Sequence, residues 1–174
     1  MIYHGVNFRY ESTMAVREIL DGIVFRRAHI SEWDTCMELA WRTFLKYEAS
    51  DYTEEGIENF REFVTEDKLK EMFLNGEYRL FVAEYGSRII GMGSLREKSH
   101  ISLLFVESRY HYMGVGRGLI DTLADSVRTD TGDTVMTVNA APYALGFYHR
   151  VGFADTDTEQ DTDGIRYTPM VLKL

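Results

Sequence analysis

Three glycines follow a short apolar run in the second half of the chain and could form an anion-binding turn. The run is Ser102–Val106, and the glycines are Gly114, Gly116 and Gly118. Glycine lacks a Cβ atom, so the backbone can take unusual dihedral angles and approach a ligand closely. A helix that begins in this turn has N–H groups without internal partners, and its dipole favours negative charge there. The sequence therefore predicts a phosphate-binding site, with Arg117 as an added cation at its rim.

Two other nucleotide-binding motifs do not match this turn. A Walker loop needs Gly-Lys-Ser/Thr at the start of the helix, and the sequence here is Gly116-Arg117-Gly118. A dinucleotide-binding fingerprint needs the spacing G-x-G-x-x-G in a first βαβ unit, whereas this turn has a different third spacing and lies late in the chain. The turn by itself leaves open a glycine-rich connection that binds nothing.

The rest of the sequence supplies strands and helices that can position the turn. Apolar β-branched runs predict strands, and apolar residues at helical spacing predict helices. The predicted strands are Ile23–Arg27, Arg79–Tyr85, Arg88–Leu95, Ser102–Val106, Val135–Asn139, Phe153–Asp157 and Tyr167–Leu174. The predicted helices begin after Ser31 and Thr53, which are expected to cap them, at Asp67, in the glycine turn and at Ala144. With Thr158–Gly164 as an acidic loop, this order indicates one mixed-sheet α/β domain.

The composition limits the class of protein. The chain has 174 residues, of which 45% are hydrophobic, and this is enough for one domain with a sizeable core. A net charge of −9 argues against non-specific nucleic-acid binding and favours cationic small molecules such as amines. The single cysteine, Cys36, allows no internal disulfide, which fits a reducing compartment. No stretch approaches the roughly 18 consecutive apolar residues of a membrane span.

The N-terminal segment does not fit the predicted sheet. Residues 1–22 are expected to form an arm or leader, with Met14 as a second start residue and the domain over residues 23–174. Residues 1–20 lack the continuous apolar core and small-residue cleavage site of a secretory signal. A cytoplasmic location is therefore expected.

The glycine turn and a later stretch together resemble the GNAT (Gcn5-related) N-acetyltransferases, a family that uses acetyl-CoA. The family motif Gln/Arg-x-x-Gly-x-Gly/Ala is matched by His111–Gly116, with His111 in place of the Gln or Arg. A later motif has an Asn that ends a strand and then Phe-Tyr-x-x-x-Gly-Phe, and it is matched by Asn139 and Phe147–Phe153. The resemblance covers about Ile23 to Leu174.

The resemblance implies a fold and a co-substrate. The fold is a GNAT-like single α/β domain, with a mixed central sheet of about six to seven strands that is splayed between the fourth and fifth strands and flanked by helices. The co-substrate is acetyl-CoA, and no metal is implied. Its pyrophosphate would lie on the backbone N–H groups of Tyr112–Gly118, and its pantetheine arm would pair with the edge of Ser102–Val106. A bulge near Leu104–Val106 is expected to open the gap between the strands.

The implied site has the following residues. The cofactor-binding residues are Leu104, Phe105, Val106, His111, Tyr112, Met113, Gly114, Val115, Gly116, Arg117, Gly118, Asn139 and Tyr148.

The reaction that the resemblance implies is the transfer of an acetyl group to an amine. Tyr148 is the expected general acid, because a Tyr hydroxyl with a pKa of about 10 can protonate a CoA thiolate whose thiol has a pKa of about 8.5. The alternative for Tyr148 is a packing residue, and the alternative for Asn139 is a cap of the strand end. The general base stays open among Glu107, Glu48, Glu97 and His100.

The acceptor is expected to be a small-molecule amine or an exposed protein amine. Tyr47, Tyr52 and Glu107 are the candidate substrate-binding residues. A non-catalytic acyl-CoA-binding regulatory module on the same fold is the alternative. A homodimer is left open, and neither nucleic acid nor membrane is expected as a partner.

Two further segments are similar to uncharacterised members of the family. They are Tyr52–Ile57, with the pattern Tyr-x-x-Glu-Gly-Ile, and Gly164–Met170, with the pattern Gly-Ile-Arg-Tyr-x-Pro-Met. This similarity does not identify a substrate.

Overall fold

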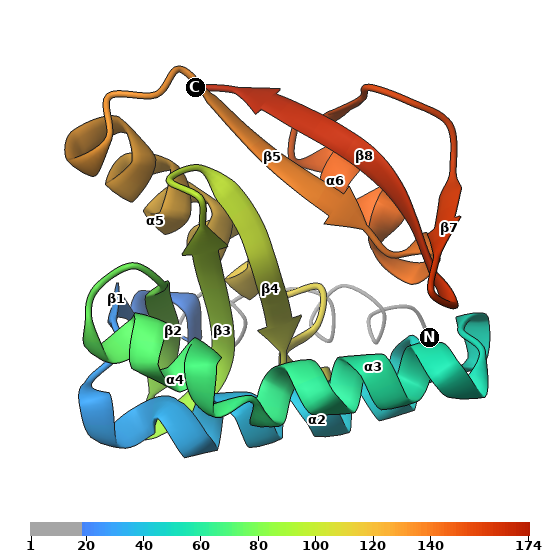
Figure 1. Cartoon of the computed structure of the whole chain (residues 1–174). Helices are drawn as coiled ribbons and strands as arrows, with labels where there is room; N and C mark the ends of the chain where they lie inside the picture. The colour runs from blue at the N-terminus through green and yellow to red at the C-terminus, as the bar shows by residue number, and fades with distance from the viewer. Residues whose placement is uncertain (1–18) are drawn as a thin grey trace, which may run out of the picture.

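An eight-stranded sheet forms the centre of the computed structural model, which describes residues 19–174 (Figure 1). The strands lie in the order β1-β2-β3-β4-β5-β8-β6, and β7 pairs with β8. Their bounds are β1 Ile23–Arg27, β2 Arg79–Tyr85, β3 Arg88–Arg96, β4 His100–Val106, β5 Val135–Ala140, β6 Ala154–Asp155, β7 Gln160–Thr162 and β8 Ile165–Lys173. Residues 1–18 of the predicted N-terminal arm, with Met14, lie outside the described residues.

Helices cover both faces of the sheet. The α-helices are α2 Trp33–Tyr47, α3 Glu54–Thr65, α4 Asp67–Leu74, α5 Val115–Asp130 and α6 Leu145–Arg150. Short 3-10 turns occur at Ile30–Glu32, Ala49–Asp51, Ser108–Tyr110 and Pro142–Ala144. Apolar residues of α2, α3 and α4 bury one face of β2, β3 and β4, while α5 and α6 bury the opposite face with β5 and β8. The predicted mixed α/β fold is confirmed.

Strands β4 and β5 are parallel neighbours, and the first two residues of β4 pair with the two central residues of β5. His100 pairs with Thr137 and Ile101 with Val138, and beyond these two positions the strands separate (Figure 1). The second half of the sheet continues independently, because β5 pairs with β8 from Val135 to Ala140. The predicted splay between the fourth and fifth strands is therefore confirmed.

A bulge lies at the point where the strands separate. Ser94 of β3 pairs with Leu103 and Leu95 pairs with Ile101, so Ser102 has no residue opposite it. The sequence-based expectation of a bulge near Leu104–Val106 is therefore wrong by a few residues. The Ser94 hydroxyl explains the position, because it accepts a hydrogen bond from the Leu103 N–H at 3.0 Å and replaces a ladder bond.

The eighth strand, β7, was not predicted. It lies in the segment that was expected to be an acidic loop, and it forms a hairpin with β8 around Asp163 and Gly164. Both turn residues have positive φ, +52° and +77°, as a two-residue hairpin of the primed type requires. The Asp-Gly dipeptide was the sequence signal for this turn.

The start of the first long helix also differs from the prediction. Ser31 was expected to cap it, but Ser31 lies inside the 3-10 turn that precedes α2. Glu32 stabilises this turn. Its carboxylate accepts a hydrogen bond from the His29 N–H at 2.7 Å and forms an ion pair with Arg26. Arg26 lowers the pKa of Glu32 to about 2. By contrast, the predicted cap Thr53 accepts a hydrogen bond from the Gly56 N–H at 3.1 Å and is confirmed.

Replacement of Ser94 by alanine should lower the stability of the protein. Ser94 is fully buried, its hydroxyl lies 2.6 Å from that of Tyr78, and the Leu103 N–H also depends on it. Loss of the hydrogen bonds to Tyr78 and to the Leu103 N–H should lower the free energy of unfolding by about 1–3 kcal/mol. Urea unfolding of Ser94→Ala measures this change, with the exposed Ser50→Ala as the control that should stay within about 0.5 kcal/mol of wild type. Equal stability of Ser94→Ala and wild type would contradict this role of the hydroxyl.

Candidate active site

The glycine turn leads into α5 as predicted and presents N–H groups that have no partner within the helix. Gly114 is the N-cap of α5 with φ +87°, a conformation that favours glycine. The first hydrogen bond of the helix runs from the Gly118 N–H to the Gly114 carbonyl at 3.0 Å. The N–H groups of Val115, Gly116 and Arg117 therefore have no acceptor within the helix and can bind an anion.

The other two glycines of the turn have packing roles. A Cβ atom on Gly118 would lie 2.2 Å from the ring of Phe25 in β1, and one on Gly116 would lie 3.0 Å from the ring of Phe147 in α6. These contacts bring α5 close to β1 and α6. The absence of a side chain at Gly118 therefore allows α5 to pack closely against Phe25 of β1, and a contact of Gly118 with a phosphate stays a prediction.

A cavity of about 670 Å³ lies between this turn, the end of β4 and α6, and we call it the turn-side cavity. The predicted cofactor residues that line it are Leu104, Phe105, Val106, His111, Tyr112, Gly114, Gly116, Arg117 and Tyr148. Met113, Val115 and Gly118 are not among its lining residues. The open edge of β4 runs along this cavity, because β5 leaves it after Ile101.

A second cavity of about 520 Å³ lies between α3, the opened strands β4 and β5, and the β7–β8 hairpin, and we call it the helix-side cavity. Aromatic side chains form much of its wall. Its polar lining residues include Arg96, His100 and Asn139, and Asp163 lies at the hairpin turn. The aromatic residues are Tyr52, Phe60, Phe63, Phe105, Tyr148 and Tyr167.

The two cavities meet at a small group of shared residues. Glu48, Leu104, Phe105, Ala144 and Tyr148 line both of them. One cavity therefore approaches this junction from the glycine turn and the other approaches it from α3. A reaction between two molecules held in the two cavities would occur at this junction.

Two titratable groups at the junction have shifted pKa values. Tyr148 is buried, with 5% of its surface exposed, and burial raises the pKa of its hydroxyl, to which the nearby Glu48 carboxylate adds. Burial also raises the pKa of Glu48 to about 7, with a smaller contribution from Asp51. A carboxylate that titrates near neutrality and a hydroxyl that stays protonated suit a base and an acid, respectively.

His111, which replaces the Gln or Arg of the sequence motif, binds within the protein. Its Nε2 lies 2.7 Å from the Val106 carbonyl, so Nε2–H donates to the end of β4. Its ring also lies against Tyr47, with 5.0 Å between the ring centroids. His111 therefore ties the loop before the glycine turn to the opened strand.

The three predicted substrate residues lie in different places. Tyr52 lines the helix-side cavity, whereas Tyr47 lines the turn-side cavity and stacks on Tyr143 with 5.2 Å between centroids. Glu107 lines neither cavity and forms ion pairs with Arg88 and Arg109 at 3.6 and 3.3 Å. Of these three residues, only Tyr52 lines the helix-side cavity.

The remaining base candidates lie farther from the junction. His100 lines the helix-side cavity at the end where β4 and β5 are paired, and its Nδ1 is 2.8 Å from the Thr137 hydroxyl. Burial lowers the pKa of His100. Glu97 lies in the turn between β3 and β4 with φ +48° and lines neither cavity. Asn139 lines the helix-side cavity, from its position in β5.

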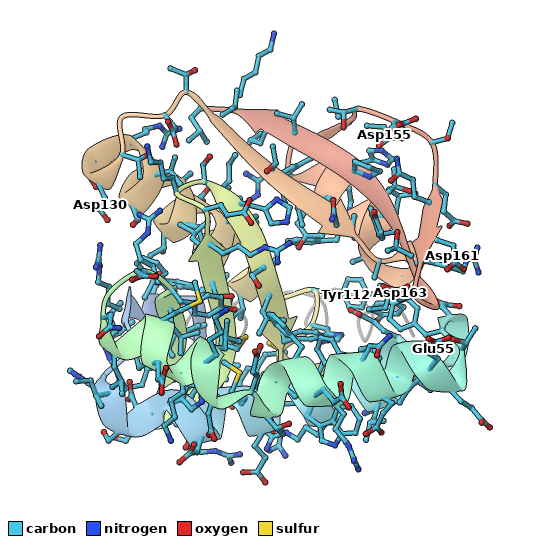
Figure 2. The ribbon with its side chains drawn as sticks, in the orientation of Figure 1. Glu55, Tyr112, Asp130, Asp155, Asp161 and Asp163 are labelled. Carbon is cyan, nitrogen blue, oxygen red and sulfur yellow. The ribbon has the colours of Figure 1, made fainter. Side chains whose placement is uncertain are left out.

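The two segments that resemble uncharacterised family members meet in the structure. The Thr53 N–H donates to the Gly164 carbonyl at 3.3 Å, and the Asn59 side chain donates to the Asp163 carbonyl at 3.0 Å. Figure 2 shows Asp163 close to Glu55 at the start of α3. We call this contact between α3 and the β7–β8 turn the clasp, and it closes one side of the helix-side cavity. Sequence reasoning identified both segments but did not predict that they touch.

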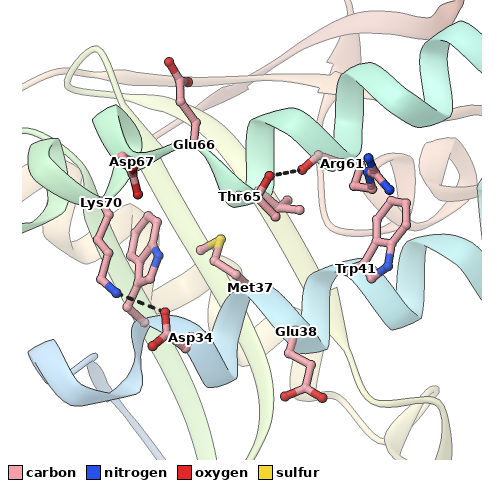
Figure 3. A pocket seen from close by; sticks show the side chains of 11 residues that line it. Asp34, Met37, Glu38, Trp41, Arg61, Thr65, Glu66, Asp67 and Lys70 are labelled. Atoms are coloured by element: carbon pink, nitrogen blue, oxygen red, sulfur yellow. Dashed lines mark hydrogen bonds and ion pairs between the residues drawn. The ribbon is translucent and has the colours of Figure 1, made fainter.

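A third cavity, of about 440 Å³, lies between α2 and the α3–α4 pair (Figure 3). Trp33, Met37 and Trp41 contribute apolar surface, and Lys70 pairs with Asp34 at 3.1 Å at its rim. It shares no lining residue with the two cavities that meet at Tyr148.

Residues 19–174 contain neither a metal-binding cluster nor a membrane-spanning helix. Within this range, no three His, Cys, Asp or Glu side chains are grouped so that they could hold a metal ion. None of the helices in the same range combines the length and the apolar character needed to cross a membrane.

Comparison with known proteins agrees with this geometry. A family model described as an acetyltransferase (GNAT) domain matches residues 48–174. A structure of a GCN5-related N-acetyltransferase from Rhodopseudomonas palustris is similar with a TM-score of 0.74 and 23% identity, covering 87% of this chain and 95% of that one. PaiA N-acetyltransferase from Thermoplasma acidophilum, solved in complex with coenzyme A, has a TM-score of 0.70 and 23% identity, covering 87% and 99%. A spermidine N-acetyltransferase chimera from Vibrio cholerae and hSSAT has a TM-score of 0.61 and 19% identity, covering 87% and 95%.

Replacement of Gly56 by alanine should open the clasp. A Cβ atom on Gly56 would lie 2.2 Å from the Gly164 carbonyl oxygen, which is backbone and cannot rotate away. Alanine favours a helix by about 1 kcal/mol over glycine, but displacement of the hairpin should outweigh this gain and lower the free energy of unfolding by about 1–3 kcal/mol. The exposed Glu62→Ala on the same helix is the control. A Gly56→Ala variant that is more stable than wild type in chemical denaturation would show that the clasp does not constrain the fold.

Proposed function

The chain belongs to the GNAT acetyltransferase family, and we propose that it transfers an acetyl group from acetyl-CoA to the amine of a small molecule or of an exposed protein residue. The observation that carries this proposal is the junction of the two cavities at Tyr148 and Glu48. Each reactant has its own cavity, and the two cavities share the residues that can move protons.

The turn-side cavity fits acetyl-CoA. The free N–H groups at the start of α5 suit the diphosphate, with Arg117 beside them, and the unpaired edge of β4 suits the amide groups of the pantetheine arm. An arm bound along β4 leads from the glycine turn to Leu104 and Phe105, which lie at the junction. PaiA N-acetyltransferase, which was solved with coenzyme A, supports this assignment through its similar fold.

The helix-side cavity would hold the acceptor amine. Glu48 is the proposed base, because it lines both cavities and because burial raises its pKa to about 7. It would accept a proton from the amine as the nitrogen forms its bond to the acetyl carbon. Glu97, Glu107 and His100, the other candidates from the sequence, do not lie at this junction.

Tyr148 is the proposed general acid. As the carbon–sulfur bond breaks, its hydroxyl would donate a proton to the departing thiolate. Burial raises the pKa of the Tyr148 hydroxyl, and the same loss of water would raise that of a thiol at the junction, so the proton transfer need not become much less favourable. The two products, the acetylated amine and the CoA thiol, would then leave neutral, because Glu48 accepts one proton and Tyr148 donates one.

A non-catalytic acyl-CoA-binding module remains the second candidate function. The turn-side cavity supports this second candidate equally well, because a non-catalytic module needs only a cavity in which acyl-CoA can bind. The acid–base pair at the junction favours the enzyme, because a binding protein needs neither group there. The cytoplasmic location and a homodimer stay predictions from the sequence.

Replacement of Tyr148 by phenylalanine should separate catalysis from binding. Release of the CoA thiol from acetyl-CoA, measured with a panel of amines, should show a kcat that is about 10²–10⁴-fold lower, because the acid is lost while the ring remains. Calorimetry should show the same affinity for CoA. Tyr85→Phe, on β2 away from both cavities, should behave as wild type.

Equal turnover of Tyr148→Phe and wild type would rule out the acid role. Thermal stabilisation of wild type by CoA, about 2.7 kcal/mol at 100 times the dissociation constant, without acetylation of any amine would favour the non-catalytic module.

The rate of transfer should depend on the ionisation of Glu48. Only the carboxylate form can accept a proton, so kcat/KM should rise with pH through about 7 and then level off. Glu48→Gln should lower kcat about 10²–10⁴-fold and remove this inflection, while Glu38→Gln, at an exposed position of the helix α2 that Glu48 follows, should keep it. An inflection that persists unchanged in Glu48→Gln would assign it to another group.

A further inference from the structure

We propose that the acceptor amine also carries a carboxylate, and that Arg96 binds this carboxylate inside the helix-side cavity. This inference rests on the proposed function, since it assigns an end of the acceptor to a residue of the acceptor cavity. It names the acceptor as an aminocarboxylate whose amine and carboxylate are separated by an apolar spacer.

Arg96 is a half-buried cation for which residues 19–174 supply no ion-pair partner. It is the last residue of β3, it pairs across the sheet with His100, and it lines the helix-side cavity. Its Nε is buried and makes no hydrogen bond, and no carboxylate within residues 19–174 lies within ion-pair distance of it. An anionic group of a ligand in the cavity would give the guanidinium a charge partner that the described residues do not supply.

Several other arginines of the chain show what Arg96 lacks. Arg26 binds Glu32 and Glu84, and Arg79 binds Asp130. These guanidinium groups are satisfied within the protein. Arg96 lines a cavity instead, and no carboxylate of residues 19–174 forms an ion pair with it.

The groups around Arg96 do not neutralise it. His100 donates or accepts at the Thr137 hydroxyl, and burial together with the charge of Arg96 lowers the pKa of His100, which disfavours a second cation beside Arg96. Glu97 follows Arg96 but lies in an exposed turn and does not line the cavity. The positive charge of Arg96 is therefore available inside the cavity.

The opposite end of the same cavity is negative. Glu48 lies there, at the junction with Tyr148, and would receive the amine of the acceptor. Along β4, His100 lies opposite Arg96 and Leu104 lies at the junction, a separation of about 13 Å at roughly 3.3 Å per residue. The long side chains of Arg96 and Glu48 shorten this span, but a simple α-amino acid, whose two groups share one carbon, does not match it.

The walls between the two ends indicate the spacer. Tyr52, Phe60, Phe63 and Tyr167 line the cavity, so an alkyl or aromatic spacer would be well accommodated. The carboxylates of Glu48 and Asp163 in the same cavity disfavour a doubly charged phosphate in comparison with a singly charged carboxylate. Together these features select an aminocarboxylate with an apolar middle.

The test compares acceptors that differ only in the carboxylate. Wild-type protein is assayed with acetyl-CoA and ω-amino acids of increasing length, starting from γ-aminobutyrate. Each is paired with the n-alkylamine of the same chain length and with the corresponding aminoalkylphosphonate. At the best length, kcat/KM for the aminocarboxylate should exceed that for the alkylamine about tenfold or more, because a charge-assisted hydrogen bond contributes about 1.5–3 kcal/mol.

Substitutions at Arg96 then assign the preference to this residue. Arg96→Gln should abolish the carboxylate preference, because KM for the aminocarboxylates should rise about tenfold or more relative to KM for the matched alkylamines. Arg96→Lys should retain part of the preference, because it keeps the charge but loses the fork of donors. Arg42→Gln, an exposed arginine of α2 outside all three cavities, should leave the preference intact.

The outcomes distinguish this inference from the proposed function. Equal rates with aminocarboxylates and alkylamines, a preference for the phosphonate, or an unchanged preference in both Arg96 variants would overturn the inference while acetyl transfer itself stands. Failure to acetylate every amine in the panel would overturn the proposed function, and the inference with it. Thermal stabilisation by CoA equal to that of wild type shows that each Arg96 variant is folded.

Discussion

Strands β4 and β5 pair at His100–Thr137 and Ile101–Val138 and then separate, and the candidate site depends on this early end of the pairing. A strand edge without a neighbour exposes N–H and C=O groups that must find other partners. In this protein the exposed edge of β4 lies along a cavity that begins at the free N–H groups of α5. The sheet therefore leaves a row of backbone donors and acceptors open for an extended ligand, and the helix start provides an anchor for its negative end.

The same separation creates the place where two ligands can meet. Because the strands part, the turn-side and helix-side cavities contact each other through the sheet, and Glu48 and Tyr148 lie at that contact. Burial there has two effects, since it raises the pKa of Glu48 to about 7 and keeps the Tyr148 hydroxyl protonated. The clasp between Thr53 and Gly164 closes one side of the helix-side cavity, so the proposed acceptor surface combines α3 with the C-terminal hairpin.

The sequence predicted the parts that depend on local patterns. The glycine turn, the long helix after it and the strands Ile23–Arg27 and Arg79–Tyr85 all follow from short-range spacing, and the structure confirms them. The parts that failed depend on tertiary contacts. The bulge lies at Ser102 because the hydroxyl of Ser94 satisfies Leu103, and Ser31 is not a cap because Arg26 positions Glu32 to organise the turn. The sequence left four candidates for the proposed base, because only the fold shows that Glu48 lines both cavities while Glu107 pairs with Arg88 and Arg109.

A crystal structure of the protein with bound CoA tests the central claim most directly. The expected result is a diphosphate at the N–H groups of Val115–Arg117 and a pantetheine arm that is hydrogen-bonded along β4 beyond Ile101, with its sulfur near Tyr148. CoA bound at another surface, or β4 and β5 paired to their ends with no ligand between them, would contradict the claim that the opened strands form the binding site.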